Sequence, residues 1–363
     1  MSPKRTEASF SGQPIYVGID VHKRQWHVSI RTQDIEHKTF TQAPQVDALV
    51  AYLHRRFPGG DYQCAYEAGF SGFGIAHGLA SHGIRCLVVH PSDIPRTERD
   101  RVYKSDPVDA RRLARELAAG RLKSIYIPDQ ESVESRMLVR MRHGFVRKQT
   151  RCKTQIRFML YLSGISLPAI VARKSWSQAS IDALGTLQLS TPSGTVALQA
   201  LVAELRHLRA QVTSLTKQIR ELSTEGPLLG HVQRLRTLPG IGILSAMTLL
   251  TEIIDIHRFR TNERLASYAG LVPGTHSSGD KQHGTGLHKR RNAELRHVLI
   301  ESAWSAVRQD PVLLAWFTQA CRRCTKSQAI VGVARRLLNR VCYVLRTEQP
   351  YVCSMNGGSI QVA

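Results

Sequence analysis

The sequence predicts a mixed α/β domain followed by a mostly helical region, on three observations. Up to residue 119, short alternating apolar runs are separated by Gly and Pro turns, in the order three strands, helix, strand, helix, strand, helix. From residue 132 onward, apolar residues recur instead at spacings of three and four, which is typical of helices. The chain of 363 residues is 42% hydrophobic, so it can bury the cores of two or three domains.

The first predicted strand is the sequence IYVGIDVHK, residues 15–23, around which the rest of the domain is expected to build. Ile15, Val17 and Ile19 alternate with other residues, and the strand ends on Asp20. Further strands are expected at WHVSI, around residues 37–40, at QCAYE and at IRCLVV, with helices over residues 46–57, 74–82 and 107–119. This order favours a mixed sheet of the RNase H type.

Four carboxylates stand at the ends of these elements. Asp20 ends the first strand, Glu67 ends the QCAYE strand, and Asp106 and Asp109 open the helix in KSDPVDARRLA. Local chemistry explains part of this pattern, since Asp starts turns and Asp106 with Asp109 fits a capping box. The same carboxylates could instead hold Mg²⁺, which prefers oxygen ligands and is commonly bound by carboxylates together with substrate phosphate. Both interpretations stay open on these residues alone.

The chain is strongly basic. Lys and Arg number 50 against 28 Asp and Glu, which gives a formal net charge of +22. A protein with this excess most often binds a polyanion, and nucleic acid is favoured over a membrane surface. Residues 1–14 have no apolar core and no apolar run is long enough to span a bilayer, so we expect a disordered tail there and a cytoplasmic protein. The seven cysteines are expected to be reduced thiols.

A basic helix is predicted over residues 132–162. It has apolar positions for packing, and its basic residues occur with no acid between residues 136 and 157. A solvated surface would account for such a helix, but unpartnered positive charges repel one another unless phosphates relieve them. We therefore expect it to bind nucleic acid through Arg136, Arg140, Arg147, Lys148, Arg151, Lys153 and Arg157.

The most regular periodicity in the chain follows an irregular, Ser- and Ala-rich stretch over residues 168–192. Apolar residues recur at alternating spacings of three and four over more than three heptads. The pattern predicts a coiled coil, either between protomers or folded back within the chain, and we favour contact between protomers in a homo-oligomer, a dimer or tetramer. The seam comprises Leu198, Leu201, Leu205, Leu208, Val212, Leu215, Ile219 and Leu222.

The last third of the chain combines helices with a loop rich in Gly, Ser and basic residues. The sequence LPGIG, residues 238–242, resembles the turn of a helix-hairpin-helix element, whose glycines let backbone N–H groups approach a phosphate; an ordinary tight turn is the alternative. Helices are expected over residues 258–271, 294–307 and 329–345. The loop VPGTHSSGDKQHGTGLHKRRN lies between the first two of these helices and is expected to contact phosphate or to take part in catalysis.

Several of these motifs occur in the order that one family shows. GIDVHK, YEAG, KSDPVDARRLA, LPGIG and YAGLVPGTHSSGDK with HKRRNAELRHVL follow one another along residues 15–345. Together they resemble the insertion-sequence-110 transposases, relatives of the Piv site-specific invertases. The resemblance implies a RuvC-like domain of RNase H fold over residues 15–130, a basic-helix and coiled-coil segment over 131–230, a mainly α-helical transposase domain over 231–345, and a tail over 346–363.

The resemblance also implies a catalytic site. The serine directly before Gly279 matches the nucleophile of the family, so we expect Ser278 to fill that role, with Ser277 as the second choice. The DEDD acids that hold Mg²⁺ in the family match Asp20, Glu67, Asp106 and Asp109. Basic residues of the serine loop are expected to neutralise charge on the phosphorus oxygens, namely Lys281, Lys289, Arg290 and Arg291.

The implied activity is DNA recombination at the nucleoid of a bacterial cell. The serine attacks a phosphodiester to give a covalent phosphoserine link, and religation follows without ATP. Donor and target DNA are the expected partners, and some members of the family are guided by a structured non-coding RNA, the bridge RNA. The acids and the serine lie in different predicted domains, so the site is expected to be composite.

Three other function classes stay open on the residues themselves. A RuvC-like nuclease would cut Holliday junctions with water in place of serine. An actin-like kinase also opens with a VGID strand, although a second glycine-rich phosphate loop is absent from the sequence and a charge of +22 is unusual for a kinase. In a non-catalytic nucleic-acid-binding protein, the acids would merely cap helices.

Overall fold

The computed structural model describes residues 10–95, 106–167, 176–278, 281–287 and 291–352. The chain divides into two compact units, residues 1–129 and residues 130–363, and each has hydrophobic cores of its own. Within the described ranges, none of the helices combines the length and the apolar composition that a membrane crossing requires.

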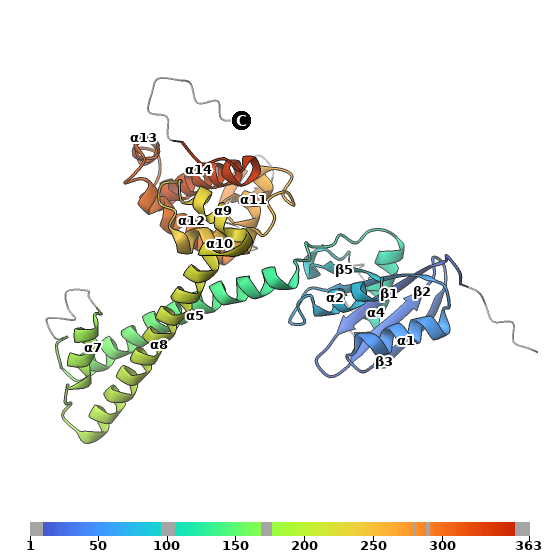
Figure 1. Cartoon of the computed structure of the whole chain (residues 1–363), viewed down its shortest axis with the longest axis horizontal. Coiled ribbons are helices and arrows are strands. Elements are labelled where there is room, and N and C mark those ends of the chain that lie inside the picture. Colours follow the sequence, from blue (N-terminus) through green and yellow to red (C-terminus); the bar gives the residue numbers. More distant parts are fainter. Residues whose placement is uncertain (1–9, 96–105, 168–175, 279–280, 288–290, 353–363) are drawn as a thin grey trace, which may run out of the picture. The chain divides into compact units, whose positions relative to one another are not determined.

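A five-stranded mixed sheet forms the centre of the first unit (Figure 1). Its spatial order is β3-β2-β1-β4-β5, in which β1 pairs antiparallel with β2 and parallel with β4, and β5 is parallel to β4. The predicted mixed sheet followed by a mostly helical region is thus confirmed. The strands are β1 (Pro14–Val21), β2 (Trp26–Arg31), β3 (Glu36–Gln42), β4 (Asp61–Glu67) and β5 (Arg85–Val89), and a single turn, η1 (Pro91–Asp93), follows β5.

Helices cover both faces of this sheet. α1 (Val46–Arg56) and α2 (Gly74–Ser81) pack against one face, in a core that includes Val17 of β1. α4 (Asp106–Ala118) packs against the other face, where Ala65 of β4 belongs to its core. Because alternate side chains of a strand point to opposite faces, the residues between the buried apolar positions of β1 face α4.

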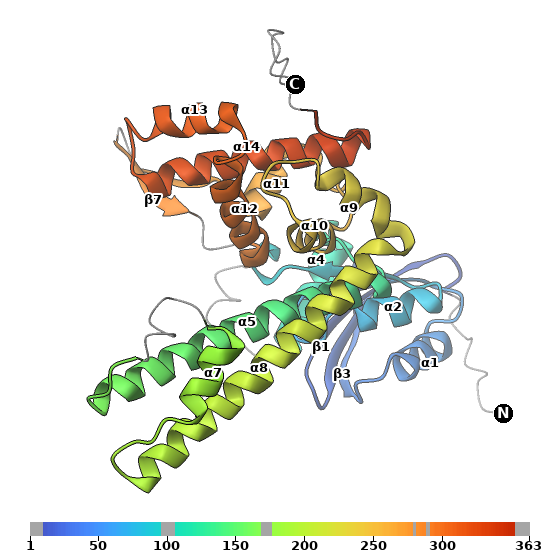
Figure 2. The ribbon, with the colours of Figure 1, turned by 60° about the vertical axis from the view of Figure 1, so that its left-hand side comes forward.

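Two long helices lie side by side in the second unit (Figures 1 and 2). α5 (Gln130–Leu162) and α8 (Pro192–Thr224) form a helical hairpin, and the short α7 (Gln178–Gly185) packs near its tip. Ile156 of α5 and Leu205 of α8 are buried in the core between them. The seam residues Leu198, Leu205 and Leu208 therefore pack within the chain, and so do Ile219 and Leu222 further along α8. Contact between protomers stays a prediction.

The remaining elements of the second unit gather around one core. Val139 of α5 and Ile219 of α8 belong to this core, so the helical hairpin shares apolar contacts with the elements that follow it. Those elements are η2 (Gly226–Leu228), α9 (Leu229–Leu235), α10 (Ile243–Ile253), α11 (Asn262–Tyr268), β6 (Pro273–Ser278), β7 (Lys281–Leu287), α12 (Ala293–Ala306), α13 (Pro311–Ala320) and α14 (Lys326–Thr347).

In the first unit, the tail expected to be disordered over residues 1–14 is ordered from residue 10, where the ring of Phe10 packs against that of Phe57. In the second unit, three local expectations were wrong. The stretch expected to be irregular contains α7, whose N-cap Ser177 accepts a hydrogen bond from the N–H of Ser180. The loop expected over residues 272–292 contains the antiparallel strands β6 and β7. The helix α13 was not expected, although Asp310 caps it and Pro311 stands at its first position, which is a typical start signal.

The LPGIG turn between α9 and α10 has a packing explanation. Gly240 has φ +79°, and a Cβ at this position would overlap the carbonyl oxygen of Ser302 in α12. The N–H of Gly240 already donates to Oε1 of Gln309 at 3.0 Å. The close approach to α12 accounts for this glycine, so phosphate binding stays a prediction for Gly242, the residue directly before α10, where a Cβ would have open space.

Candidate active site

Two acidic residues lie on the face of the sheet that α4 covers. Asp20 stands two residues after Gly18 near the end of β1, and Glu67 stands two residues after Ala65 at the end of β4. Gly18 and Ala65 are partners in the parallel pairing, so the two acids reach the same edge of the sheet. A Cβ at Gly18 would overlap the backbone of α4. Asp20 and Glu67 therefore stand two residues along their strands from the point where the sheet contacts α4.

The first turns of α4 supply the other two predicted acids together with a buried arginine. Asp106, Asp109 and Arg112 stand three residues apart and share one side of the helix. Nη2 of Arg112 donates to Oε1 of Glu67 at 3.1 Å and lies 2.9 Å from Oδ1 of Asp109. The Arg112 side chain is 4% exposed, so this guanidinium compensates two of the carboxylates from inside the protein.

A histidine joins the remaining two acids. Nε2 of His22 lies 3.0 Å from Oδ2 of Asp20 and 3.4 Å from Oδ2 of Asp106, and Nε2 of His27 lies 3.5 Å from the same oxygen of Asp106. One ligand atom from each of Asp20, His22 and Asp106 lies within 4.8 Å of the others. The structure thus brings the predicted acids together as two pairs, one around His22 and one around Arg112.

His22 and Arg112 were not among the predicted site residues. His22 stands two residues after Asp20 in the motif GIDVHK, which was a visible signal for a neighbour on the same side of the strand. Arg112 stands three residues after Asp109, a spacing that allows an ion pair within a helix. The burial of Arg112 beside the end of β4, however, results from the packing of α4 on the sheet. It cannot be predicted from residue spacing within one helix.

The acids at this edge of the sheet favour a cation. Burial raises the pKa of the Asp20 carboxyl above its ordinary value; His22 opposes this shift, and the negative charges of Asp106 and Asp109 add to it. When the pKa of a carboxyl group is raised in this way, a positive charge beside it stabilises the ionised form. The carboxylate oxygens of Asp20 and Asp106 are ligands that suit a divalent cation such as Mg²⁺ or Mn²⁺, and the imidazole of His22 lies beside them.

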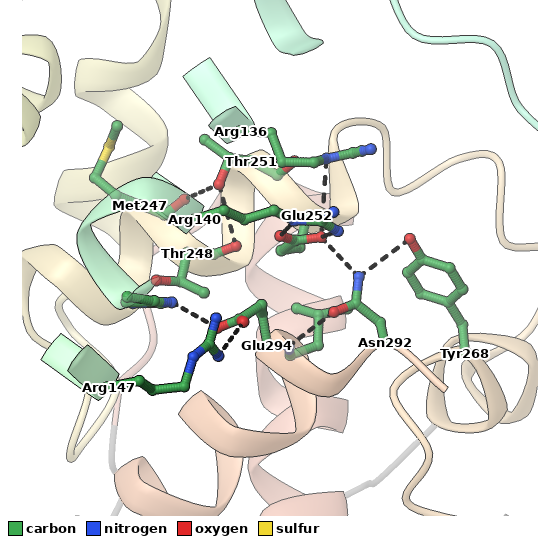
Figure 3. A network of polar contacts seen from close by, with 12 residues as sticks. Arg136, Arg140, Arg147, Met247, Thr248, Thr251, Glu252, Tyr268, Asn292 and Glu294 are labelled. Carbon is green, nitrogen blue, oxygen red and sulfur yellow. Dashed lines mark hydrogen bonds and ion pairs between the residues drawn. The ribbon is translucent and has the colours of Figure 1, made fainter. Parts of the chain in front are cut away.

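Three of the predicted nucleic-acid-binding arginines have acidic partners within the second unit (Figure 3). Arg140 donates to both carboxylate oxygens of the buried Glu252 at 2.6 and 2.8 Å, and Nε of Arg136 lies 3.8 Å from the same carboxylate. Arg147 donates to Glu294 at 2.7 Å. The prediction that these charges have no partners was therefore wrong for these three arginines, because α10 and α12 supply the acids that α5 lacks between residues 136 and 157.

The other predicted basic residues of α5 lie on or near its surface. Arg151 and Lys148 are exposed. Nζ of Lys153 and the guanidinium of Arg157 lie over the ring of Trp176, 5.7 and 5.4 Å from its centroid. Burial lowers the pKa of Lys153, and neighbouring arginines lower it further. No acid stands among these four residues on α5 between positions 136 and 157, and their contact with nucleic acid stays a prediction.

The predicted nucleophile lies at the end of a β-hairpin. Ser278 is the last residue of β6, its backbone pairs with Lys281 at the start of β7, and Ser277 pairs with Gln282. The structure describes the backbone of these two strands but not their side chains, and Lys289 and Arg290 lie outside the described residues. Arg291 is described and stands where the chain leaves the hairpin. The roles predicted for these residues stay predictions.

Comparisons with known proteins agree with the fold of both units. A family model described as "Transposase IS116/IS110/IS902 family" matches residues 232–317, and a DEDD transposase model of the IS110 type matches residues 17–163. The protein named "Putative transposase y4qE" of Sinorhizobium fredii is 34% identical over 244 residues, which are 67% of this chain and 58% of that protein. The chain thus spans less than two thirds of that relative. The transposase for insertion sequence element IS1111A of Coxiella burnetii is 25% identical over 255 residues, 69% of each chain. With both units matched and its motifs in the predicted order, this chain belongs to the IS110/IS116/IS902 family of transposases.

Proposed function

We propose that this protein is the DNA recombinase of an insertion sequence, and that it cuts and rejoins DNA with a Mg²⁺-dependent DEDD site and a serine nucleophile. The observation that carries the proposal is the convergence of Asp20, Glu67, Asp106 and Asp109 under α4, from three elements that are distant in sequence. The strand order β3-β2-β1-β4-β5 supports a RuvC-like assignment of the first unit.

Each group has one task in the proposed reaction. Mg²⁺ bound by the acids would polarise the phosphodiester and offset the charge that develops on it. Asp20 and Asp106 would hold the ion, while Arg112 keeps Glu67 and Asp109 beside them. The hydroxyl of Ser278 loses its proton as its oxygen bonds to phosphorus, and the DNA oxygen that leaves gains a proton and becomes a hydroxyl.

Rejoining reverses this step on a different strand. The free hydroxyl of the incoming DNA attacks the phosphoserine, and the serine is regenerated. One phosphodiester is broken and one is made, so the reaction conserves bond energy, in keeping with the absence of a GxxxxGK[ST] loop from the sequence. The proposal needs the serine and the acids to act on the same phosphodiester.

Nucleic-acid partners are also part of the proposal. Donor and target DNA would be recognised with the help of a structured non-coding RNA, and the protein would act as a homo-oligomer. The net charge of +22 supports polyanion binding, and the exposed Lys148 and Arg151 on α5 offer a surface for phosphates.

The test is covalent capture on a denaturing gel. Labelled duplex carrying the junction of the element would be incubated with Mg²⁺ and with RNA transcribed from the element's non-coding flank. We expect a protein-sized shift in the unmutated chain and in Ser277→Ala, and none in Ser278→Ala. Asp20→Asn and Asp109→Asn should bind the duplex normally and form no adduct. Free cleaved ends without any adduct would favour the water-using nuclease and overturn the serine role.

A further inference from the structure

The two ends of the β6–β7 hairpin are held together by contacts among described residues. The N–H of Asn292, after β7, donates to the carbonyl oxygen of Tyr268, before β6, at 2.8 Å. Gly270 has φ +70°, and a Cβ there would lie 2.5 Å from Cβ of Arg291. The chain therefore enters and leaves the hairpin through one tight contact, in which a larger residue at Gly270 would not fit.

Asn292 makes more contacts than its position at the helix start requires. It is the N-cap of α12, and its Oδ1 accepts the N–H of Leu295 at 3.0 Å. Its Nδ2 donates to Oε2 of Glu252 at 2.7 Å and to the hydroxyl of Tyr268 at 3.2 Å (Figure 3). An Asp, Ser or Thr would cap the helix equally well, but none of them has a second group that donates two hydrogen bonds.

Glu252 fixes the position of Asn292 from the other side. The glutamate is fully buried on α10, and its carboxylate accepts both the Asn292 amide and the two hydrogen bonds of Arg140. A buried carboxylate is tolerated when it is paired and hydrogen-bonded on all sides. Here the partners come from α5 and from the end of the hairpin, so Glu252 joins the base of the hairpin to the rigid body of the second unit.

We propose that Asn292 is a positioning residue, which holds the base of the β6–β7 hairpin on Glu252 and thereby sets where the predicted nucleophile stands. The proposal rests on the proposed role of Ser278. In this proposal, Asn292 at the N-terminus of α12 and Glu252 on α10 affect catalysis through the backbone of the hairpin. Asn292 itself does not contact the DNA.

The first test separates positioning from capping. Asn292→Asp keeps a good N-cap but places a second carboxylate against Glu252, so the two groups repel each other. We expect amide hydrogen exchange in residues 273–287 to rise about tenfold, because two hydrogen bonds at the base of the hairpin are lost. Exchange in α14 should stay unchanged. If exchange in the hairpin stays at the level of the unmutated protein, Asn292 is a cap and nothing more.

A second variant tests the pairing itself. Combining Glu252→Gln with Asn292→Asp exchanges the donor and the acceptor, since the new amide group would donate to the new carboxylate. The amide oxygen still accepts from Nε of Arg140, whereas Nη2 of Arg140 loses its acceptor in this variant. We expect slow exchange in residues 273–287 to return. Failure of the double variant to restore it overturns the proposal. Thr325→Ala, which removes the capping box of α14, serves as the control for a general loss of stability.

The catalytic readout uses the same variants. Adduct yield per bound duplex should fall about tenfold in Asn292→Asp, as expected for the lost hydrogen bonds, and should recover in the double variant, with duplex affinity unchanged in both. An Asn292→Asp chain that forms adduct at the full rate contradicts the proposal. If the unmutated protein forms no adduct, the serine mechanism fails, and the exchange measurements still decide whether Asn292 holds the hairpin.

Discussion

Gly18 of β1 lies directly against the backbone of Ala110 in α4, so closely that a Cβ at Gly18 would overlap the Ala110 carbonyl oxygen. This contact packs α4 on the sheet, so that an acid of the strand and an acid of the helix stand close to the same point. Asp20 follows two residues later on the strand, and Asp109 directly precedes Ala110 on the helix. The distance between the acids therefore depends on a residue that has no side chain.

Gly18→Ala should separate the acids and destabilise the first unit. The clash is with backbone, which no rotamer change relieves, so we expect a loss of about 3 kcal/mol in the free energy of unfolding. Metal-induced stabilisation, measured by thermal unfolding with and without MgCl₂, should fall as well. Gly69→Ala is the matched control, because the nearest atom to its Cβ is 4.0 Å away. Equal unfolding midpoints for the two variants would contradict this account of α4 packing.

Arg112→Gln should make the protein more dependent on Mg²⁺. The change leaves Glu67 and Asp109 without their buried counter-charge, and breaking such a pair costs about 3 kcal/mol. A divalent cation can replace part of the lost charge, so added MgCl₂ should raise the unfolding midpoint of this variant more than that of the unmutated protein. Arg111→Gln, which removes an exposed ion pair with Glu36, should show neither effect. Identical responses to MgCl₂ would argue against an acidic metal site beside Arg112.

The basic residues of α5 should divide into two groups. Replacing Lys148 and Arg151 together by Ala should flatten the dependence of log K on log salt by about two units, because two phosphate contacts are lost. Arg140→Ala should instead lower the free energy of unfolding by about 3 kcal/mol, because it leaves Glu252 buried with part of its charge unpaired. Filter-binding titrations and denaturant unfolding measure the two effects. An unchanged salt slope in the double variant would mean that this surface is merely solvated.

The apolar seam of α8 should also contain two groups of residues, one that packs within the chain and one that joins protomers. Leu208 is buried in the core that α8 shares with α5, so Leu208→Glu should disrupt the helical hairpin whether or not protomers associate. Leu215 is half-buried, and Leu215→Glu should reduce the particle size by light scattering if this part of the seam joins protomers. Helix content, followed by circular dichroism, should stay unchanged in that variant. A particle of unchanged size would place the oligomer contact elsewhere.

Acid should weaken the contact between α5 and α12. Burial lowers the pKa of His143, more than Glu294 raises it; burial would raise the pKa of Glu294, but hydrogen bonds from Arg147 and His143 hold it below its ordinary value. Both folded-state pKa values lie below the unfolded ones. Stability is therefore present above the ordinary histidine pKa of 6.5 and falls as the pH drops below it.

The measurement for this contact is a comparison with His143→Gln, which keeps a donor for Glu294 and removes the titration. Between pH 7 and pH 5.5, the free energy of unfolding should fall less in this variant than in the unmutated protein. If both lose stability equally over that range, the contact between His143 and Glu294 does not contribute to the pH dependence.

The sequence by itself determined the secondary structure of the first unit and the family. Period-two apolar runs and turn residues marked all five strands, since the pattern of strands is local, and three short motifs marked the four acids. α7 and α13 were missed although their N-caps, Ser177 and Asp310, are local signals too. The β6–β7 hairpin was missed because Gly- and Ser-rich strands lack the apolar alternation on which such predictions depend.

Only the tertiary structure decided which charges meet. Along α5 the arginines have no acid within reach, yet Arg140 and Arg147 find Glu252 and Glu294 more than a hundred residues away. In the same way, the exposed or buried state of Arg112 depends on the packing of α4 against β1 and β4. Charge interactions are set by distance in space and by burial, and neither quantity can be read from spacing within one helix.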